Sequence, residues 1–217
     1  MGGQLKATFC LVKDGKAILS QHQGDLEHPA AFDDYGKNLA LFCDLFEHAA
    51  VALAADRHPE YQSAKLARDR AQAQRLPLIE VQHHHAHLAA CLDENARPLG
   101  ASPALGIVLD GLGWGDDGTI WGGEFLWGDY RGYERLASLA QVAMPGGAQA
   151  VREPWRNLYA QLIRATGWPE LARRFGDHRT AILAARGDLA LETPIASDCA
   201  ALHRLIAALL EAASRPC

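Results

Sequence analysis

Residues 76–94 read LPLIEVQHHHAHLAACLDE, an apolar strand that runs directly into a helix. A strand followed at once by a helix is the repeating unit of α/β folds. The same alternation precedes this stretch, because apolar residues recur at helical spacing over residues 31–50 and a short apolar run follows at residues 51–55. The sequence therefore predicts an α/β fold with mixed sheets.

A loop expected at residues 95–103 separates two blocks of strands and helices. In the first block, Asp14-Gly15 is the dipeptide of a tight hairpin turn. The elements expected in this block are strands at residues 8–12, 17–21, 51–55 and 76–81 and helices at residues 31–50, 61–75 and 85–94. Those expected in the second block are strands at residues 105–109, 119–127 (broken at Gly122-Gly123) and 133–139, a helix opening at Glu153-Pro154 and a helix at residues 200–213.

Composition limits the classes of function. The 217 residues are 49% hydrophobic, enough to bury a core, and the net charge of −5 with no run of basic residues makes nucleic acid an unlikely partner. The N-terminus lacks the apolar core of a signal peptide, and no apolar run approaches the roughly 20 residues of a membrane helix. The five cysteines form no C-x-x-C pair. We therefore expect a cytoplasmic protein with reduced thiols and no membrane partner.

The histidine cluster is the strongest candidate for chemistry. His83 and His87 are four positions apart, so on a helix they project from one face at about 40° to each other. Two imidazoles one turn apart can bind one metal ion, while His84 and His85 point elsewhere. The alternative is a polar helix start exposed to solvent. No Glu lies between the ligand histidines, which excludes the H-E-x-x-H motif of metalloproteases.

A zinc or iron ion on these histidines needs further ligands, and carboxylates are suitable. Asp110 is the best local candidate, because it is expected to end a buried strand after one intervening helix and loop. The equally weighted alternative is an Asp that caps a glycine-rich turn at residues 110–118.

Two further features suggest anion binding, and each has an ordinary explanation. The glycines of residues 110–118 allow a phosphate to approach the backbone, but the pattern is neither a P-loop nor G-x-G-x-x-G, and most such segments are simple turns. Arg152 and Arg156 place two guanidinium groups at an expected helix start. Guanidinium groups bind phosphate or carboxylate, although surface ion pairs are the more frequent explanation.

Seven segments, taken in order, carry a family resemblance. They are residues 2–11, 20–26, 56–61, 81–87, 110–113, 118–125 and 152–156. Together they resemble the hydrogenase maturation carbamoyltransferase family HypF, over about residues 2–165. No single segment is specific, whereas their combination and order are.

The resemblance implies a Kae1-like carbamoyl-transfer domain with the actin-like, sugar-kinase-like fold of two lobes. Lobe one is expected at residues 4–98 without its first strand, and an incomplete lobe two at residues 104–217, so the fold is expected to be truncated at both ends. The implied metal ligands are His83, His87 and Asp110. The implied substrate- or nucleotide-binding residues are Gly111, Gly113, Gly122, Gly123, Arg152 and Arg156.

The family makes carbamoyl-adenylate from carbamoyl phosphate and ATP, and passes the carbamoyl group to the C-terminal cysteine of HypE during [NiFe] hydrogenase maturation. The resemblance therefore implies a carbamoyltransferase fragment with a divalent metal, carbamoyl-adenylate or ATP as substrate, and HypE and other hydrogenase maturation proteins as partners. The alternatives are a non-catalytic metal-binding remnant or interaction module, and an O-carbamoyl or threonylcarbamoyl transferase to another acceptor. The sequence departs from the family at Ala7, where many relatives have Asn, and at Leu112, where Thr or Ser is usual.

Overall fold

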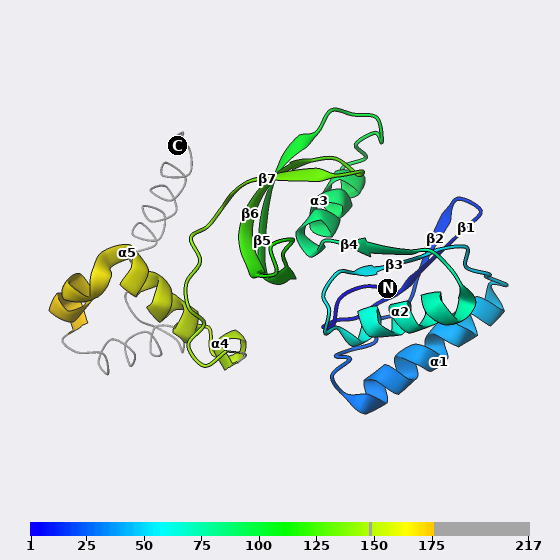
Figure 1. Ribbon diagram of the computed structural model, residues 1–217, viewed down its shortest axis with the longest axis horizontal. Helices are drawn as coiled ribbons and strands as arrows, with labels where there is room; N and C mark the ends of the chain where they lie inside the picture. Colours follow the sequence, from blue (N-terminus) through cyan, green and yellow to red (C-terminus); the bar gives the residue numbers. More distant parts are fainter. Residues whose placement is uncertain (148, 176–217) are drawn as a thin grey trace. The chain divides into compact units, whose positions relative to one another are not determined.

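The computed structural model describes residues 1–147 and 149–175 of the chain (Figure 1). Its contacts divide into two units, Met1–Leu136 and Ala137–Cys217. No helix within the described part is long and apolar enough to cross a membrane. The observed elements are mixed helices and strands, as the sequence predicted, whereas the expected lobe boundaries at residues 4–98 and 104–217 stay a prediction.

The first unit begins with a β-hairpin of β1 (Cys10–Lys13) and β2 (Lys16–Leu19). Its turn residues Asp14 and Gly15 both have positive φ, 52° and 74°. Two successive left-handed residues make a type I′ turn, whose twist matches that of the paired strands. The hairpin predicted from Asp-Gly is therefore confirmed.

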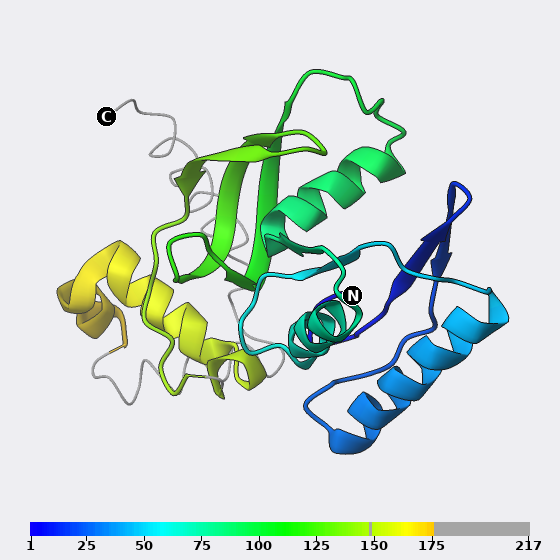
Figure 2. The same ribbon diagram turned by 45° about the vertical axis from the view of Figure 1, so that its right-hand side comes forward.

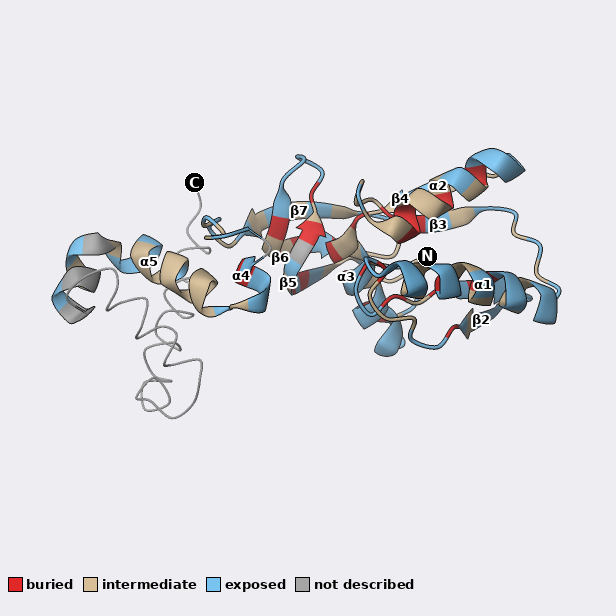
Figure 3. Ribbon diagram, turned by 90° about the horizontal axis from the view of Figure 1, so that it is seen from below, coloured by how far each residue is buried: buried red, intermediate tan, exposed pale blue. Residues whose placement is uncertain are grey.

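Helix α1 (Pro29–Leu45) packs on the residues around this hairpin. Pro29 stands at the first turn, where its missing N–H costs no hydrogen bond. The helix ends earlier than predicted, because Glu47 takes a left-handed conformation (φ 47°) and Lys13 Nζ donates to the carbonyls of Phe46 and Glu47. Most of its surface is exposed or half-buried (Figure 3). The core that it covers consists of Ala7, Phe9, Leu11, Leu26, Tyr35 and Leu39.

The next elements form a β-α-β unit of β3 (Leu53–Asp56), α2 (Gln62–Gln74) and β4 (Leu78–Val81). The two strands are parallel, and the crossover helix presents a buried stripe of Ala64, Ala67 and Ala71. Asp56 is in register with Val81 at the carboxyl ends of the pair. The residues that follow β4 therefore emerge beside Asp56.

Helix α3 (His83–Glu94) starts directly after β4. The Gln82 side chain caps it by accepting the N–H of His85 at 2.8 Å. Helix α3 lies along a three-stranded sheet of β5 (Ala104–Trp114), β6 (Ile120–Gly128) and β7 (Tyr133–Ser138) (Figure 2). Its Leu88 and Leu92 pack against that sheet. The second core consists of Leu88, Leu92, Val108, Trp121 and Leu126.

The sheet corrects two predictions about glycine-rich sequence. Strand β5 (Ala104–Trp114) does not end before Asp110 but continues through the glycines, with an irregularity in register between Leu109 and Gly113. Strand β6 (Ile120–Gly128) is not broken at Gly122-Gly123. The turn lies instead between these strands, where the Gly115 N–H donates to the Thr119 carbonyl. Nor is β5 buried on both faces, because Leu105, Ile107 and Leu109 are 53%, 55% and 72% exposed.

Strand β7 (Tyr133–Ser138) completes the sheet. In the second unit, α4 (Gln149–Arg152) precedes α5 (Trp155–Phe175), which begins directly after Glu153-Pro154, in agreement with the predicted helix start. Gly167 interrupts α5 with non-helical angles. The helix predicted at residues 200–213 lies outside the described residues.

Candidate metal centre

Three predicted ligands converge in the first unit. The Nε2 of His83 lies 3.0 Å from Asp110 Oδ2, and the Nε2 of His87 lies 3.8 Å from the same oxygen. The two Nε2 atoms are 3.2 Å apart. All three ligand atoms lie within 4.8 Å of one another. One helical turn of α3 places the imidazoles side by side, and β5 supplies the carboxylate opposite them.

This donor set fits a divalent cation. Two imidazole nitrogens and one carboxylate oxygen suit zinc or iron, and three protein ligands leave a coordination position for a substrate. Exposure of the side chains supports access, because His87 is 55% exposed and Asp110 31% exposed. The geometry can therefore hold a metal whose open side faces solvent.

The second nitrogen of His83 is fixed by a residue that we did not predict as part of the site. Asp56 Oδ2 accepts a hydrogen bond from His83 Nδ1 at 2.5 Å. With Nδ1 carrying the proton, the Nε2 lone pair is directed at the ligand cluster. The segment 56–61 resembled the family, but its closeness to His83 depends on the parallel pairing of β3 and β4, which no local pattern shows.

The charges at the site perturb one another. The hydrogen bond to Asp110, together with that to Asp56, raises the pKa of His83 to about 9. The hydrogen bond from His83 lowers the pKa of Asp110 to about 2. In the metal-free chain the pair is therefore ionised near neutral pH, and a cation that replaces the His83 proton releases it to solvent.

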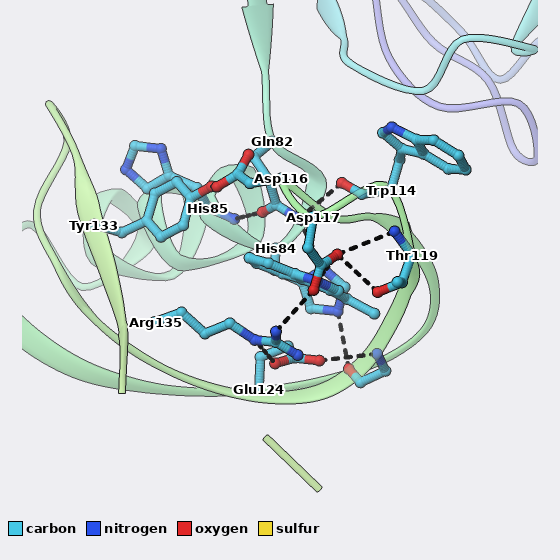
Figure 4. Close-up of polar contacts among 12 residues, drawn as sticks. Gln82, His84, His85, Trp114, Asp116, Asp117, Thr119, Glu124, Tyr133 and Arg135 are labelled. Carbon is cyan, nitrogen blue, oxygen red and sulfur yellow. Dashed lines mark hydrogen bonds and ion pairs between the residues drawn. The ribbon is translucent and has the colours of Figure 1, made fainter. Parts of the chain in front are cut away.

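His84 and His85 bond to groups outside the ligand cluster, as helical spacing predicted. Figure 4 shows both side chains with their polar neighbours. His84 is fully buried, and its Nε2 donates to the Gly122 carbonyl at 2.9 Å while its Nδ1 accepts from Gln82 Nε2 at 3.3 Å. Burial lowers the pKa of His84, consistent with a neutral ring. His85 Nε2 donates to the Asp129 carbonyl at 2.7 Å. These two histidines serve the packing of α3 on the sheet.

The glycines predicted to bind substrate have different surroundings. A Cβ at Gly113 would lie 2.2 Å from His84 Cε1, so this glycine allows His84 to pack, whereas a Cβ at Gly111 would meet no atom within 4 Å. The Gly111 N–H donates to Asp110 Oδ1. Gly122 is held between the His84 ring and Glu124, and Gly123 is in register with Leu109.

Glu124, which bonds the Gly122 N–H, forms an ion pair with Arg135 that is visible in Figure 4. Glu124 is 2% exposed, and its Oε2 accepts from Arg135 Nε at 2.6 Å while its Oε1 accepts from the Gly122 N–H at 3.1 Å. Arg135 also pairs with Asp117 at 3.2 Å and stacks on the Trp121 ring. These contacts fix the backbone of Gly122, whose carbonyl accepts the hydrogen bond from His84.

The predicted arginines lie in the second unit. Arg152 is the last residue of α4, and Arg156 pairs with Glu153 at 2.6 Å and stacks on Trp155. For Arg156, the structure therefore records the ion pair that the sequence left open as an alternative.

A groove of about 380 Å³ adjoins the candidate metal centre between α3 and β5. Its walls are mainly apolar, and His87 and Asp110 are among the residues that line it. The ligand cluster is thus beside a hollow that combines apolar walls with a few polar groups, the usual character of a small-molecule site. The lining residues are His87, Leu88, Cys91, Leu92, Ala104, Leu105, Gly106, Ile107, Val108, Leu109 and Asp110.

Known families match nearly the whole chain. A family described as the HypF Kae1-like domain matches residues 1–94, and one described as the carbamoyltransferase Kae1-like domain, second subdomain, matches residues 106–215. Carbamoyltransferase HypF of Rhodobacter capsulatus is 43% identical over 213 residues, which cover 96% of this chain and 28% of that relative. The chain thus spans little more than a quarter of the relative's length.

Two further similarities extend this finding. The crystal structure of full-length HypF in the phosphate- and nucleotide-bound form superposes with a TM-score of 0.70 at 33% identity, covering 85% of this chain and 24% of that chain. Carbamoyl dehydratase HypE of Rhodobacter capsulatus is 47% identical over 60 residues, which cover 28% of this chain and 18% of that protein. The predicted Kae1-type α/β fold is therefore confirmed.

Proposed function

This chain belongs to the HypF carbamoyltransferase family, and we propose that it builds the family's carbamoyl-transfer site. The donor is carbamoyl-adenylate, and the acceptor is the C-terminal cysteine thiol of HypE. The sulfur forms a bond to the carbamoyl carbon, the bond from that carbon to the phosphate oxygen breaks, AMP leaves and the thiol proton passes to solvent. The observation that carries the proposal is the convergence of His83, His87 and Asp110 beside a groove.

A divalent zinc or iron ion on these residues would supply Lewis-acid polarisation of the carbamoyl carbonyl. The chain's own residues provide the positioning. His83 is held by the hydrogen bond between its Nδ1 and Asp56, and Asp110 is held by the Gly111 N–H. A rigid set of ligands keeps its geometry while the substrate changes, so little reorganisation is needed during transfer.

Nucleotide contacts are a further part of the proposal. The open face of Gly111 leaves room for an adenylate phosphate beside Asp110, and Gly122 and Gly123 shape the neighbouring strand backbone. In the second unit, Arg152 and Arg156 are the candidates for binding a phosphate by charge. Gly113 contributes by admitting His84 rather than by touching the substrate. The phosphate and nucleotide named for the full-length HypF structure are consistent with such a ligand class in the family.

Acceptor choice rests on the family. The residues 118–124 and 152–156 resemble HypF rather than proteins that modify tRNA, and the net charge of −5 with no run of basic residues argues against nucleic acid as the acceptor. The similarity of a 60-residue stretch to a HypE protein supports the same biochemical setting.

Metal analysis coupled to a transfer assay tests the proposal. The purified chain, loaded with Zn²⁺ or Fe²⁺, is mixed with carbamoyl-adenylate and HypE, and the mass of HypE is measured. We expect about one metal ion per chain and a HypE adduct of one carbamoyl group, both lost in His87→Ala. His22→Ala, at an exposed histidine outside the cluster, serves as the control. Equal metal content in the wild type and in a His83→Ala/His87→Ala chain would contradict the site.

A further inference from the structure

The segment Asp56-Arg57-His58 at the end of β3 contacts the metal cluster through Asp56. We propose that Asp56 is the positioning residue of the ligand His83. The inference rests on the proposed metal centre. Asp56 fixes the His83 tautomer and ring orientation, and its neighbours Arg57 and His58 hold this arrangement in place.

The first argument is geometric. Asp56 Oδ2 lies 2.5 Å from His83 Nδ1, which is the ring nitrogen on the side away from Asp110 and His87. Among the described residues, the groups that could hold a metal ion together are His83, His87 and Asp110, without Asp56. Asp56 therefore contacts the ligand and not the ion. A carboxylate on the second nitrogen of a metal-binding histidine sets its tautomer and raises its basicity.

The second argument is burial. The Asp56 side chain is 6% exposed, so its charge requires partners. The first is His83, and the second is the backbone N–H of His58, which donates to Asp56 Oδ1 at 2.8 Å. With one donor on each oxygen, the carboxylate is fixed in orientation. The ring of His58 in turn stacks on Tyr61 with centroids 4.0 Å apart.

The third argument is topological. The parallel register places Asp56 beside Val81, which lies two residues before the start of the ligand helix. Arg57, the next residue, forms an ion pair with Asp116 in the turn between β5 and β6. Tyr133 O–H also donates to Asp116. Asp56 therefore contacts the helix that carries His83, and Arg57 contacts the β5-β6 hairpin that carries Asp110.

Zinc affinity and histidine tautomer test the inference in the full chain. Asp56→Asn keeps the shape but removes the charge, and its amide can donate to Nδ1 and leave the proton on Nε2, where it blocks the metal. We expect zinc affinity to fall roughly 10- to 100-fold, with partial recovery in Asp56→Glu. Nitrogen-15 shifts of the zinc-loaded wild type should show the metal on Nε2 of His83 and a proton on Nδ1. The matched control is Asp34→Asn, an exposed carboxylate on α1.

The outcomes separate this inference from the proposed function. If the wild-type chain binds no zinc, the metal centre itself fails. If the wild type binds zinc and Asp56→Asn binds it as tightly, Asp56 has no positioning role. Should Asp56→Asn not fold, the zinc-loaded wild type still decides the question. Coordination through Nε2 of His83 with a protonated Nδ1 supports the inference, and coordination through Nδ1 overturns it.

Discussion

His83 has a carboxylate on each ring nitrogen, Asp56 on one and Asp110 on the other. The pKa of His83 is raised to about 9 and that of Asp110 is lowered to about 2. The stability from His83 is fully present below its unfolded pKa of about 6.5 and is lost as the pH rises through about 9. The stability from Asp110 is present above about pH 3.8 and is lost as the pH falls through about 2.

The metal-free chain should therefore lose stability from this pair between about pH 6.5 and pH 9. Urea unfolding in the presence of a chelator, at about pH 5.5 and about pH 9, measures the change. In His83→Gln the loss over this range should be smaller than in the wild type, while His22→Gln should keep the wild-type loss. An identical pH dependence in the wild type and His83→Gln would show that the pair contributes nothing.

The ligands and their support differ in how far sequence could predict them. His83 and His87 share one helix, so their spacing alone places them together. For Asp110, a metal-ligand role and a turn-capping role were equally weighted, because its approach to α3 depends on how the helix packs on the sheet. Asp56 stands 27 positions from His83 and meets it only through the pairing of β3 with β4. Contacts that depend on which strands pair, and in which register, cannot be predicted from the hydrophobic periodicity of a single sequence.

Two glycines of β5 differ in their surroundings, because Gly113 packs against the His84 ring and Gly111 faces open space. Replacing each by Ala tests whether packing requires glycine at these positions. A Cβ at Gly113 would lie 2.2 Å and 2.3 Å from atoms of the buried His84 ring, whereas a Cβ at Gly111 would meet nothing within 4 Å. Gly113→Ala should therefore destabilise the chain by about 2–4 kcal/mol through overpacking, and Gly111→Ala by less than about 1 kcal/mol. Thermal or urea unfolding of both variants measures this, and equal effects would contradict the packing role.

The same glycines explain why two strand boundaries were predicted wrongly. Gly-rich stretches with Asp are typical of turns, so residues 110–118 and Gly122-Gly123 suggested interruptions. In the structure, glycine is needed at Gly113 and Gly115 because a side chain there would collide with a neighbouring aromatic ring. A Cβ at Gly115 would lie 2.0 Å from Trp121 Nε1, as Gly113 faces His84. Glycine within a strand can mark the close approach of another group, and sequence alone does not distinguish this from a turn.

At the scale of the whole chain, the α/β class followed from the alternation of strand and helix, and the family followed from seven short segments. Both are confirmed. The division of the first unit into two separate cores did not follow from the pattern. One core gathers around Phe9 and Tyr35 and the other around Leu88 and Trp121. Apolar periodicity shows which face of an element is buried, but not which partner buries it.

The described residues also present an apolar face that hydrophobic periodicity would place inside. Along β5, Leu105 and Ile107 are 53% and 55% exposed, while the intervening Gly106 and Val108 face α3. Leu105 is in register with Trp127, which is 43% exposed. Large contiguous apolar surfaces bind hydrophobic dyes and promote association.

Replacing Leu105 and Ile107 together by Thr should therefore lower the fluorescence of the dye ANS and reduce concentration-dependent association measured by light scattering. Threonine suits a strand, and few packing contacts are removed, so the free energy of unfolding should change by less than about 1 kcal/mol. Val108→Thr is the control, because Val108 is only 9% exposed. It should destabilise the chain by about 1–3 kcal/mol without lowering dye binding. If Leu105→Thr/Ile107→Thr instead destabilised the chain strongly and left dye binding unchanged, this face would be covered in solution.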